Sequence, residues 1–92
     1  MEQLKQLYQT LENRKTADPG SSYTARLFQM GEDEIIKKIG EEAIEVILAA
    51  KSQGELRIIE ETADLTYHLL VLLVSKGITL DQIQEELKKR QK

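Results

Sequence analysis

The sequence predicts an all-α protein with four or five helices in an oligomeric helical bundle. Apolar residues recur every three or four positions through most of the chain, which is the spacing of one helical face. One proline and five glycines leave few places where long helices can be interrupted. A chain of 92 residues has room for one core, so we expect a single domain over residues 1–92. A core this small is marginally stable alone, and oligomerisation is a common way to supplement it.

The first helix is expected over Glu2–Lys15. It carries four apolar residues on one face, namely Leu4, Leu7, Tyr8 and Leu11. Residues 16–22 contain the only proline and form the clearest loop in the sequence. Either Ser22 or Thr24 can cap a short helix that ends near Gly31.

The second long helix is expected to begin with the acidic residues at 32–34, whose charges suit a helix N-terminus. It runs to about Gln53, with Gly54 as its C-cap. Gly40 lies inside this helix, where glycine costs roughly 1 kcal/mol relative to alanine. We therefore expect close backbone packing or a space requirement beside Gly40.

The third helix is expected over Leu56–Lys76, stopped by Gly77. Its residues 68–74 are apolar on nearly all sides, which is typical of a helix buried all round. A lone bundle of this size encloses few helices so completely. We therefore expect a subunit interface on this helix.

The last helix opens with Thr79 and Gln82 at the spacing of a capping box, and it is expected to fray over residues 88–92. We expect the two central helices to pack as an antiparallel pair. We expect the first and last helices to flank that pair.

Acidic residues three positions apart occur on both central helices. Glu42 and Glu45 share one face of the second helix, and Glu61 and Asp64 share one face of the third. In an antiparallel pair these four carboxylates can converge, and their mutual repulsion is then relieved by a divalent cation. Oxygen ligands without cysteine favour Mg²⁺, with Mn²⁺ as the other option. The spacing alone is equally compatible with solvated helix surfaces.

Composition and charge exclude several classes of protein. The net charge is −3, whereas a non-specific nucleic-acid binder needs a basic surface. The longest nearly continuous apolar run, Leu69–Val74, is far shorter than the roughly 20 residues of a membrane-spanning helix. The N-terminus reads as an amphipathic helix rather than a signal peptide. The lack of cysteine fits a reducing compartment. We expect a cytoplasmic protein that binds neither nucleic acid nor membranes.

Taken together, the acidic motifs resemble those of a known superfamily, the all-α MazG-like nucleotide pyrophosphohydrolases. The resemblance rests on Glu61-x-x-Asp64 and on the stretch Lys38-Ile39-Gly40-Glu41-Glu42-Ala43-x-Glu45. Further elements narrow it to the phosphoribosyl-ATP pyrophosphatases, and these are Arg14-Lys15, Ser22-Tyr23-Thr24 and residues 63–73. The resemblance covers nearly the whole chain.

This resemblance implies hydrolysis of the α–β phosphoanhydride of phosphoribosyl-ATP to phosphoribosyl-AMP and pyrophosphate, the second step of histidine biosynthesis. It implies Mg²⁺ as the cofactor that activates the water. Carried over residue by residue, the metal ligands are Glu42, Glu45, Glu61 and Asp64. The runner-up is a house-cleaning pyrophosphatase for non-standard nucleoside triphosphates. A helical oligomerisation module with solvated acidic faces is the alternative from another class.

Other residues near these motifs have a functional and a plainer interpretation. Glu41 is a base that orients water, a group supporting the ligands, or a surface residue. Lys38 holds a phosphate or pairs with the neighbouring glutamates. His68 supports Asp64 or is a packed core histidine. Five residues are expected to contact the phosphates and ribose of the substrate, namely Arg14, Lys15, Ser22, Tyr23 and Thr24. Their plainer roles are charges at a helix end and caps of the short helix. We expect a homodimer or a higher homo-oligomer.

Overall fold

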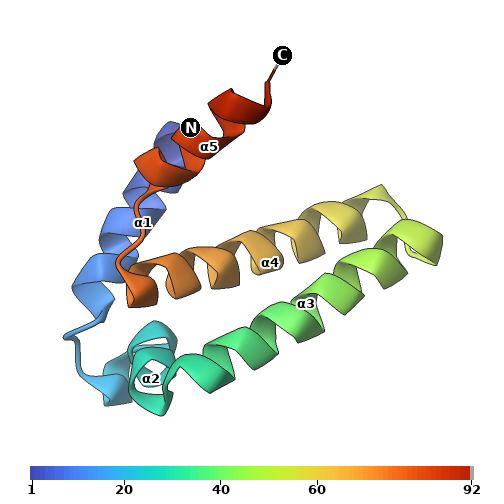
Figure 1. Cartoon of the computed structure of the whole chain (residues 1–92). Helices are drawn as coiled ribbons and strands as arrows, with labels where there is room; N and C mark the ends of the chain where they lie inside the picture. The colour runs from blue at the N-terminus through green and yellow to red at the C-terminus, as the bar shows by residue number, and fades with distance from the viewer. Residues whose placement is uncertain (92) are drawn as a thin grey trace.

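The computed structural model describes residues 1–91, and within them it contains five α-helices, one short 3₁₀ helix and no strand (Figure 1). The helices in chain order are α1 (Glu2–Arg14), α2 (Tyr23–Met30), α3 (Glu32–Ser52), α4 (Glu55–Lys76) and α5 (Leu80–Arg90), with the 3₁₀ helix at Pro19–Ser21. The all-α prediction is confirmed. No single helix in this part of the chain is long and apolar enough to cross a membrane, and α4 with α5 reaches that composition only as a pair bent by 111°.

The two longest helices, α3 and α4, pack antiparallel along their length and form the predicted central pair (Figure 1). α2 packs against the beginning of α3, and α1 packs against α4. The first and last helices differ from the expected arrangement. α1 and α5 lie together at one end of the pair instead of flanking it along its length, so the other end of the α3–α4 hairpin projects away from the rest of the chain (Figure 1).

The core lies where α1, α2, α3 and α4 meet. Its buried side chains come from all four helices and are Tyr8, Leu11, Leu27, Ile35, Leu70, Val71 and Val74. Leu11, Ile35 and Val71 are almost completely enclosed. The core therefore fixes one end of the hairpin, and the acidic motifs are placed farther along the two helices.

Two predicted helix starts are confirmed by side-chain caps. The Ser22 hydroxyl accepts a hydrogen bond of 3.2 Å from the backbone N–H of Ala25, which settles the choice between Ser22 and Thr24 in favour of Ser22. Thr79 and Gln82 form the capping box that begins α5. The sequence predicts both caps correctly because each depends on residues three positions apart in the chain.

Two predicted helix ends need correction. Gly54 is not the C-cap of α3, because that helix ends at Ser52 with Gln53 as the cap, and Gly54 precedes α4 with a φ of +90°. Such a φ favours glycine, so Gly54 makes the tight turn between the helices. The last helix does not fray from residue 88, because α5 continues to Arg90. Lys92, the final residue of the expected frayed segment, lies outside the described residues.

Gly40 lies in open space, contrary to the close packing expected beside it. A Cβ atom built there meets no atom within 4 Å. Ile36 and Ile44 lie one turn before and after it and are 50% and 58% exposed, and Ile47 is 60% exposed. We call Ile36, Gly40, Ile44 and Ile47 the α3 outer face. Within residues 1–91, the three isoleucines of this face are therefore at least half exposed.

Residues 68–74 of α4 are only partly enclosed within the single chain, and the subunit interface expected on this segment stays a prediction. Leu70, Val71 and Val74 point into the core, whereas Leu69 is 41% exposed. Some apolar side chains on the projecting half of the hairpin are more exposed than Leu69, including Leu56 at 68% and Ile59 at 58%. Exposed apolar surface is therefore spread over the hairpin and is not confined to the expected segment.

Tyr8 ties the first helix to the segment before the last one. Its hydroxyl donates a hydrogen bond of 2.7 Å to the carbonyl of Ile78. Burial, with a smaller contribution from Glu12, raises the pKa of the Tyr8 phenol. We expect Tyr8→Phe to lower the free energy of unfolding by about 1 kcal/mol, because the Ile78 carbonyl loses its partner.

Urea denaturation followed by circular dichroism measures this loss. Thr10→Val is the matched control, because the Thr10 hydroxyl bonds the Gln6 carbonyl on the exposed side of the same helix. A Tyr8→Phe protein as stable as the control would show that the long-range hydrogen bond contributes nothing.

Candidate active site

Three carboxylates from the two central helices converge on one place. Glu42 of α3 and Glu61 and Asp64 of α4 each offer an oxygen, and these three atoms lie within 4.8 Å of one another. The span across an Mg²⁺ octahedron is about 4.2 Å, and carboxylate oxygens are the ligands that this ion prefers. Glu61 is 7% exposed and Asp64 lies at the surface, so the cluster opens from the hairpin interior to solvent. A hard divalent cation fits this arrangement.

The fourth predicted ligand, Glu45, is not part of this three-residue cluster. It lies on the same face of α3 as Glu42, about one turn farther along, and it is partly buried. The Arg57 guanidinium of α4 has a raised pKa, caused mainly by its hydrogen bond to Glu60, and the charge of Glu45 adds a smaller contribution. A metal contact from Glu45 stays a prediction.

Arg57 is a residue of the site that the sequence analysis missed. Its Nη2 atom donates to Oε1 of Glu61 at 2.6 Å, and its Nη1 atom donates to Oε1 of Glu60 at 2.8 Å. The hydrogen bond that Arg57 donates to Glu60, followed by the charge of Glu61, raises the pKa of Arg57 above its usual value. The spacing of three and four residues was the available signal, because such pairs are neighbours on a helix.

Glu42 is the clustered carboxylate whose pKa is raised. Partial burial is the main reason that its pKa is raised, and the charge of Asp64 adds to the effect. Glu61 acts in the same direction, while His68 and Lys38 oppose it. The folded protein therefore holds a proton on Glu42 more tightly than an exposed glutamate does, and a bound cation would remove that cost.

This raised pKa gives stability a defined pH dependence. The folded state binds the proton of Glu42 more tightly than the unfolded state, so ionising Glu42 costs stability as the pH rises above the ordinary value of 4.5. In the presence of a chelator, we expect Glu42→Gln to gain stability relative to the wild type between pH 4.5 and neutrality. Denaturant unfolding of both proteins across this range measures the difference. A difference that is constant with pH would contradict the assignment.

His68 connects the carboxylate region to α2. Its Nδ1 atom donates to the backbone carbonyl of Asp64 at 2.9 Å, because a carbonyl can only accept. In the neutral ring the Nε2 atom then accepts from the Tyr23 hydroxyl, at 3.2 Å. His68 thus contacts the backbone of Asp64 and not its carboxylate. The hydroxyls of Thr24 and Tyr67 form a second hydrogen bond between α2 and α4.

Lys38 and Glu41 are placed differently from each other. The Lys38 ammonium lies 3.7 Å from the Glu41 carboxylate, which is the plain helical ion pair. The positive charge of Lys38 also opposes two raised pKa values, those of Glu42 and Tyr23, and burial is the main cause of both. Glu41 is 51% exposed on its side chain and is not among the three clustered carboxylates.

The predicted substrate residues divide into two groups. Tyr23 and Thr24 bond to side chains of α4 next to Asp64, while Ser22 is engaged as the cap of α2. Arg14 and Lys15 are exposed near the end of α1. Lys15 lines a groove with residues that include Ala25, Phe28 and Ser75, and none of the clustered carboxylates lines it.

Comparison with known proteins agrees with the geometry. The family model described as Phosphoribosyl-ATP pyrophosphohydrolase matches residues 4–91. A phosphoribosyl-ATP pyrophosphatase of Leptospira biflexa is 56% identical over 90 residues, which cover 98% of each chain. The protein of that name from Lactiplantibacillus plantarum is 50% identical over 91 residues, covering 99% of this chain and 86% of the relative. One from Clostridium botulinum is 51% identical over 84 residues, or 91% and 76%. The chain therefore belongs to the phosphoribosyl-ATP pyrophosphohydrolase family.

Proposed function

We propose that this protein hydrolyses phosphoribosyl-ATP to phosphoribosyl-AMP and pyrophosphate, the second step of histidine biosynthesis, with Mg²⁺ held by its clustered carboxylates. The observation that carries the proposal is the convergence of Glu42, Glu61 and Asp64 from two helices in a chain of this family. Relatives bearing the activity in their names align along nearly the whole chain, which favours this substrate over non-standard nucleoside triphosphates.

In this reaction one water is consumed and the phosphoanhydride between the α- and β-phosphates is cleaved, which gives phosphoribosyl-AMP and pyrophosphate. A bound Mg²⁺ would supply positive charge that neutralises the triphosphate and orients the attacking water. Glu42, Glu61 and Asp64 would hold this ion, and Glu45, on the same face of α3 as Glu42, would be a fourth ligand. Lys38 brings a positive charge beside Glu42, where it can hold a phosphate oxygen.

The substrate's ribose and phosphates are assigned to the α2 end of the site. Tyr23 is 43% exposed, and its ring stacks on Tyr67 with the centroids 6.4 Å apart. Its hydroxyl is oriented by His68, which in turn holds the backbone of Asp64. Substrate contacts at Tyr23 would thus lie next to the metal ligands. Arg14 and Lys15 remain proposed contacts for the outer phosphates.

Pyrophosphate release tests the proposed reaction. Phosphoribosyl-ATP is incubated with the protein with and without Mg²⁺, beside dATP, ITP and dUTP. We expect turnover confined to phosphoribosyl-ATP and dependent on the metal. Turnover of the other triphosphates instead would move the protein to the house-cleaning class, and no turnover would leave the oligomerisation module.

We also propose that two copies of the chain pack through the α3 outer face. Glycine inside a helix costs roughly 1 kcal/mol relative to alanine. Gly40 has no neighbour in the single chain that requires its small size, yet it lies at the centre of an exposed apolar face. A helix of a second copy seated over Gly40 would explain both features. The two copies would cover Ile36, Ile44 and Ile47.

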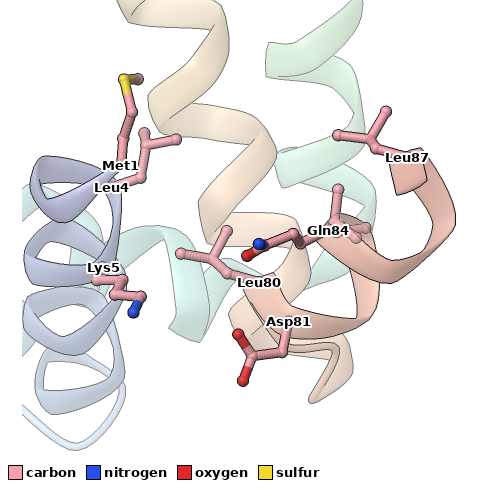
Figure 2. A pocket seen from close by; sticks show the side chains of 8 residues that line it. Met1, Leu4, Lys5, Leu80, Asp81, Gln84 and Leu87 are labelled. Carbon is pink, nitrogen blue, oxygen red and sulfur yellow. The ribbon is translucent and has the colours of Figure 1, made fainter. Parts of the chain in front are cut away.

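An apolar groove lies between α1 and α5. Figure 2 shows Met1 and Leu4 on one side and Leu80 and Leu87 on the other. Met1 and Leu87 are 86% and 61% exposed. The groove exposes apolar side chains, and the α3 outer face remains the proposed interface between two copies.

A further inference from the structure

We propose that Arg57 is a positioning residue that competes with the divalent cation for Glu61 and so weakens the metal affinity of the enzyme. The inference rests on the proposed metal site. It concerns a residue outside the acidic motifs, and it predicts a direction of change opposite to that expected for a residue that merely supports a ligand.

The contact between Arg57 and Glu61 is short and involves the most buried of the three clustered carboxylates. The Nη2 atom of Arg57 is 2.6 Å from Oε1 of Glu61, whose side chain is 9% exposed. The Arg57 side chain itself is 46% exposed. Solvent therefore reaches the guanidinium but hardly reaches the carboxylate. A cation that binds Glu61 must share or displace the positive charge already placed on it.

The same guanidinium neutralises more than one carboxylate. It contacts Glu60 at 2.8 Å, and the charge of Glu45 acts on it from α3. Arg57, Glu61, Asp64 and His68 follow one another on one stripe of α4, at spacings of three and four residues. Arg57 thus lies in line with the proposed metal ligands of α4. A carboxylate at this position would attract the cation, whereas Arg57 places a positive charge there.

Two opposing effects decide whether a substitution of Arg57 raises or lowers the affinity for the metal. Groups that hydrogen-bond a metal ligand commonly improve metal binding by fixing the ligand's orientation. Glu61 is already enclosed by the hairpin, so its orientation depends mainly on burial. The positive charge of Arg57, in contrast, repels a divalent cation directly. We therefore expect the charge effect to prevail.

Titration calorimetry with Mg²⁺ alone tests the inference on the full chain. We expect Arg57→Gln to lower the Mg²⁺ dissociation constant about two- to fivefold, the range for an exposed ion pair. Arg57→Lys keeps the charge and should restore the wild-type value. The rise in melting temperature caused by saturating Mg²⁺ provides a second readout, and it should be larger for Arg57→Gln than for the wild type.

The matched control is Arg90→Gln. Arg90 pairs with Glu86 at 3.2 Å with the same four-residue spacing, but both side chains are exposed on α5. It should leave the Mg²⁺ affinity unchanged. An unchanged or weaker affinity of Arg57→Gln, in a wild type that binds Mg²⁺, overturns this inference and leaves the proposed function intact. A wild type that binds no Mg²⁺ overturns both.

Discussion

Glu61→Gln is expected to lower the rate of pyrophosphate release from phosphoribosyl-ATP by about 1000-fold, the loss of several kcal/mol of transition-state stabilisation. Glu61 is the most buried of the three clustered carboxylates. The amide keeps the size of the side chain but removes the charge that attracts Mg²⁺. Steady-state assays over a range of Mg²⁺ concentrations measure the loss and show how far added metal restores the rate.

Glu55→Gln provides the control for this experiment. Glu55 is exposed in the first turn of the same helix and lies outside the cluster. Its variant should keep the wild-type rate, and circular dichroism should show that both variants remain folded. A Glu61→Gln protein with activity within tenfold of the control would remove the carboxylate cluster from the mechanism.

The parts of the fold that the sequence predicts correctly depend on short spacings along the chain. Ser22 and Thr79 cap helices through bonds to residues three positions ahead. Gly77 ends α4 with a φ of +73°, a conformation that few other residues adopt readily. The convergence of Glu42 with Glu61 and Asp64 also follows from helical spacing, once the two helices are antiparallel.

The features that the sequence did not predict depend on distances between helices and on rotamers. Spacing places Glu45 on the same face as Glu42, but only the crossing of α3 over α4 decides which of them joins the cluster. Arg57 has two acidic neighbours at helical spacing, and its attachment to the buried Glu61 depends on the local packing. Helical pairs of this kind are common on surfaces, so the pattern carried little information.

Gly40 illustrates a different limit. A glycine inside a helix correctly marks an unusual position, but the sequence does not say whether the reason lies within the chain or in a second copy. The structure removes the first explanation, because a Cβ atom at Gly40 would meet nothing within 4 Å. A neighbour from a second copy, as in the proposed dimer, would be a physical reason for a small residue there.

Ile47→Asp is expected to separate the proposed dimer, raising its dissociation constant by at least about 100-fold, because it places an unpaired charge in an apolar interface. Ile47 is 60% exposed in the single chain, so the substitution should leave the fold of each copy intact. Light scattering after size exclusion measures the mass. Gln9→Asp, at an exposed site on α1, adds the same charge away from the α3 outer face and should not change the mass.

Because Gly40 lies on this face, Gly40→Ala should weaken association while strengthening the helix itself. A wild type that is monomeric, or an Ile47→Asp protein that stays associated, would show that a second copy does not cover this surface.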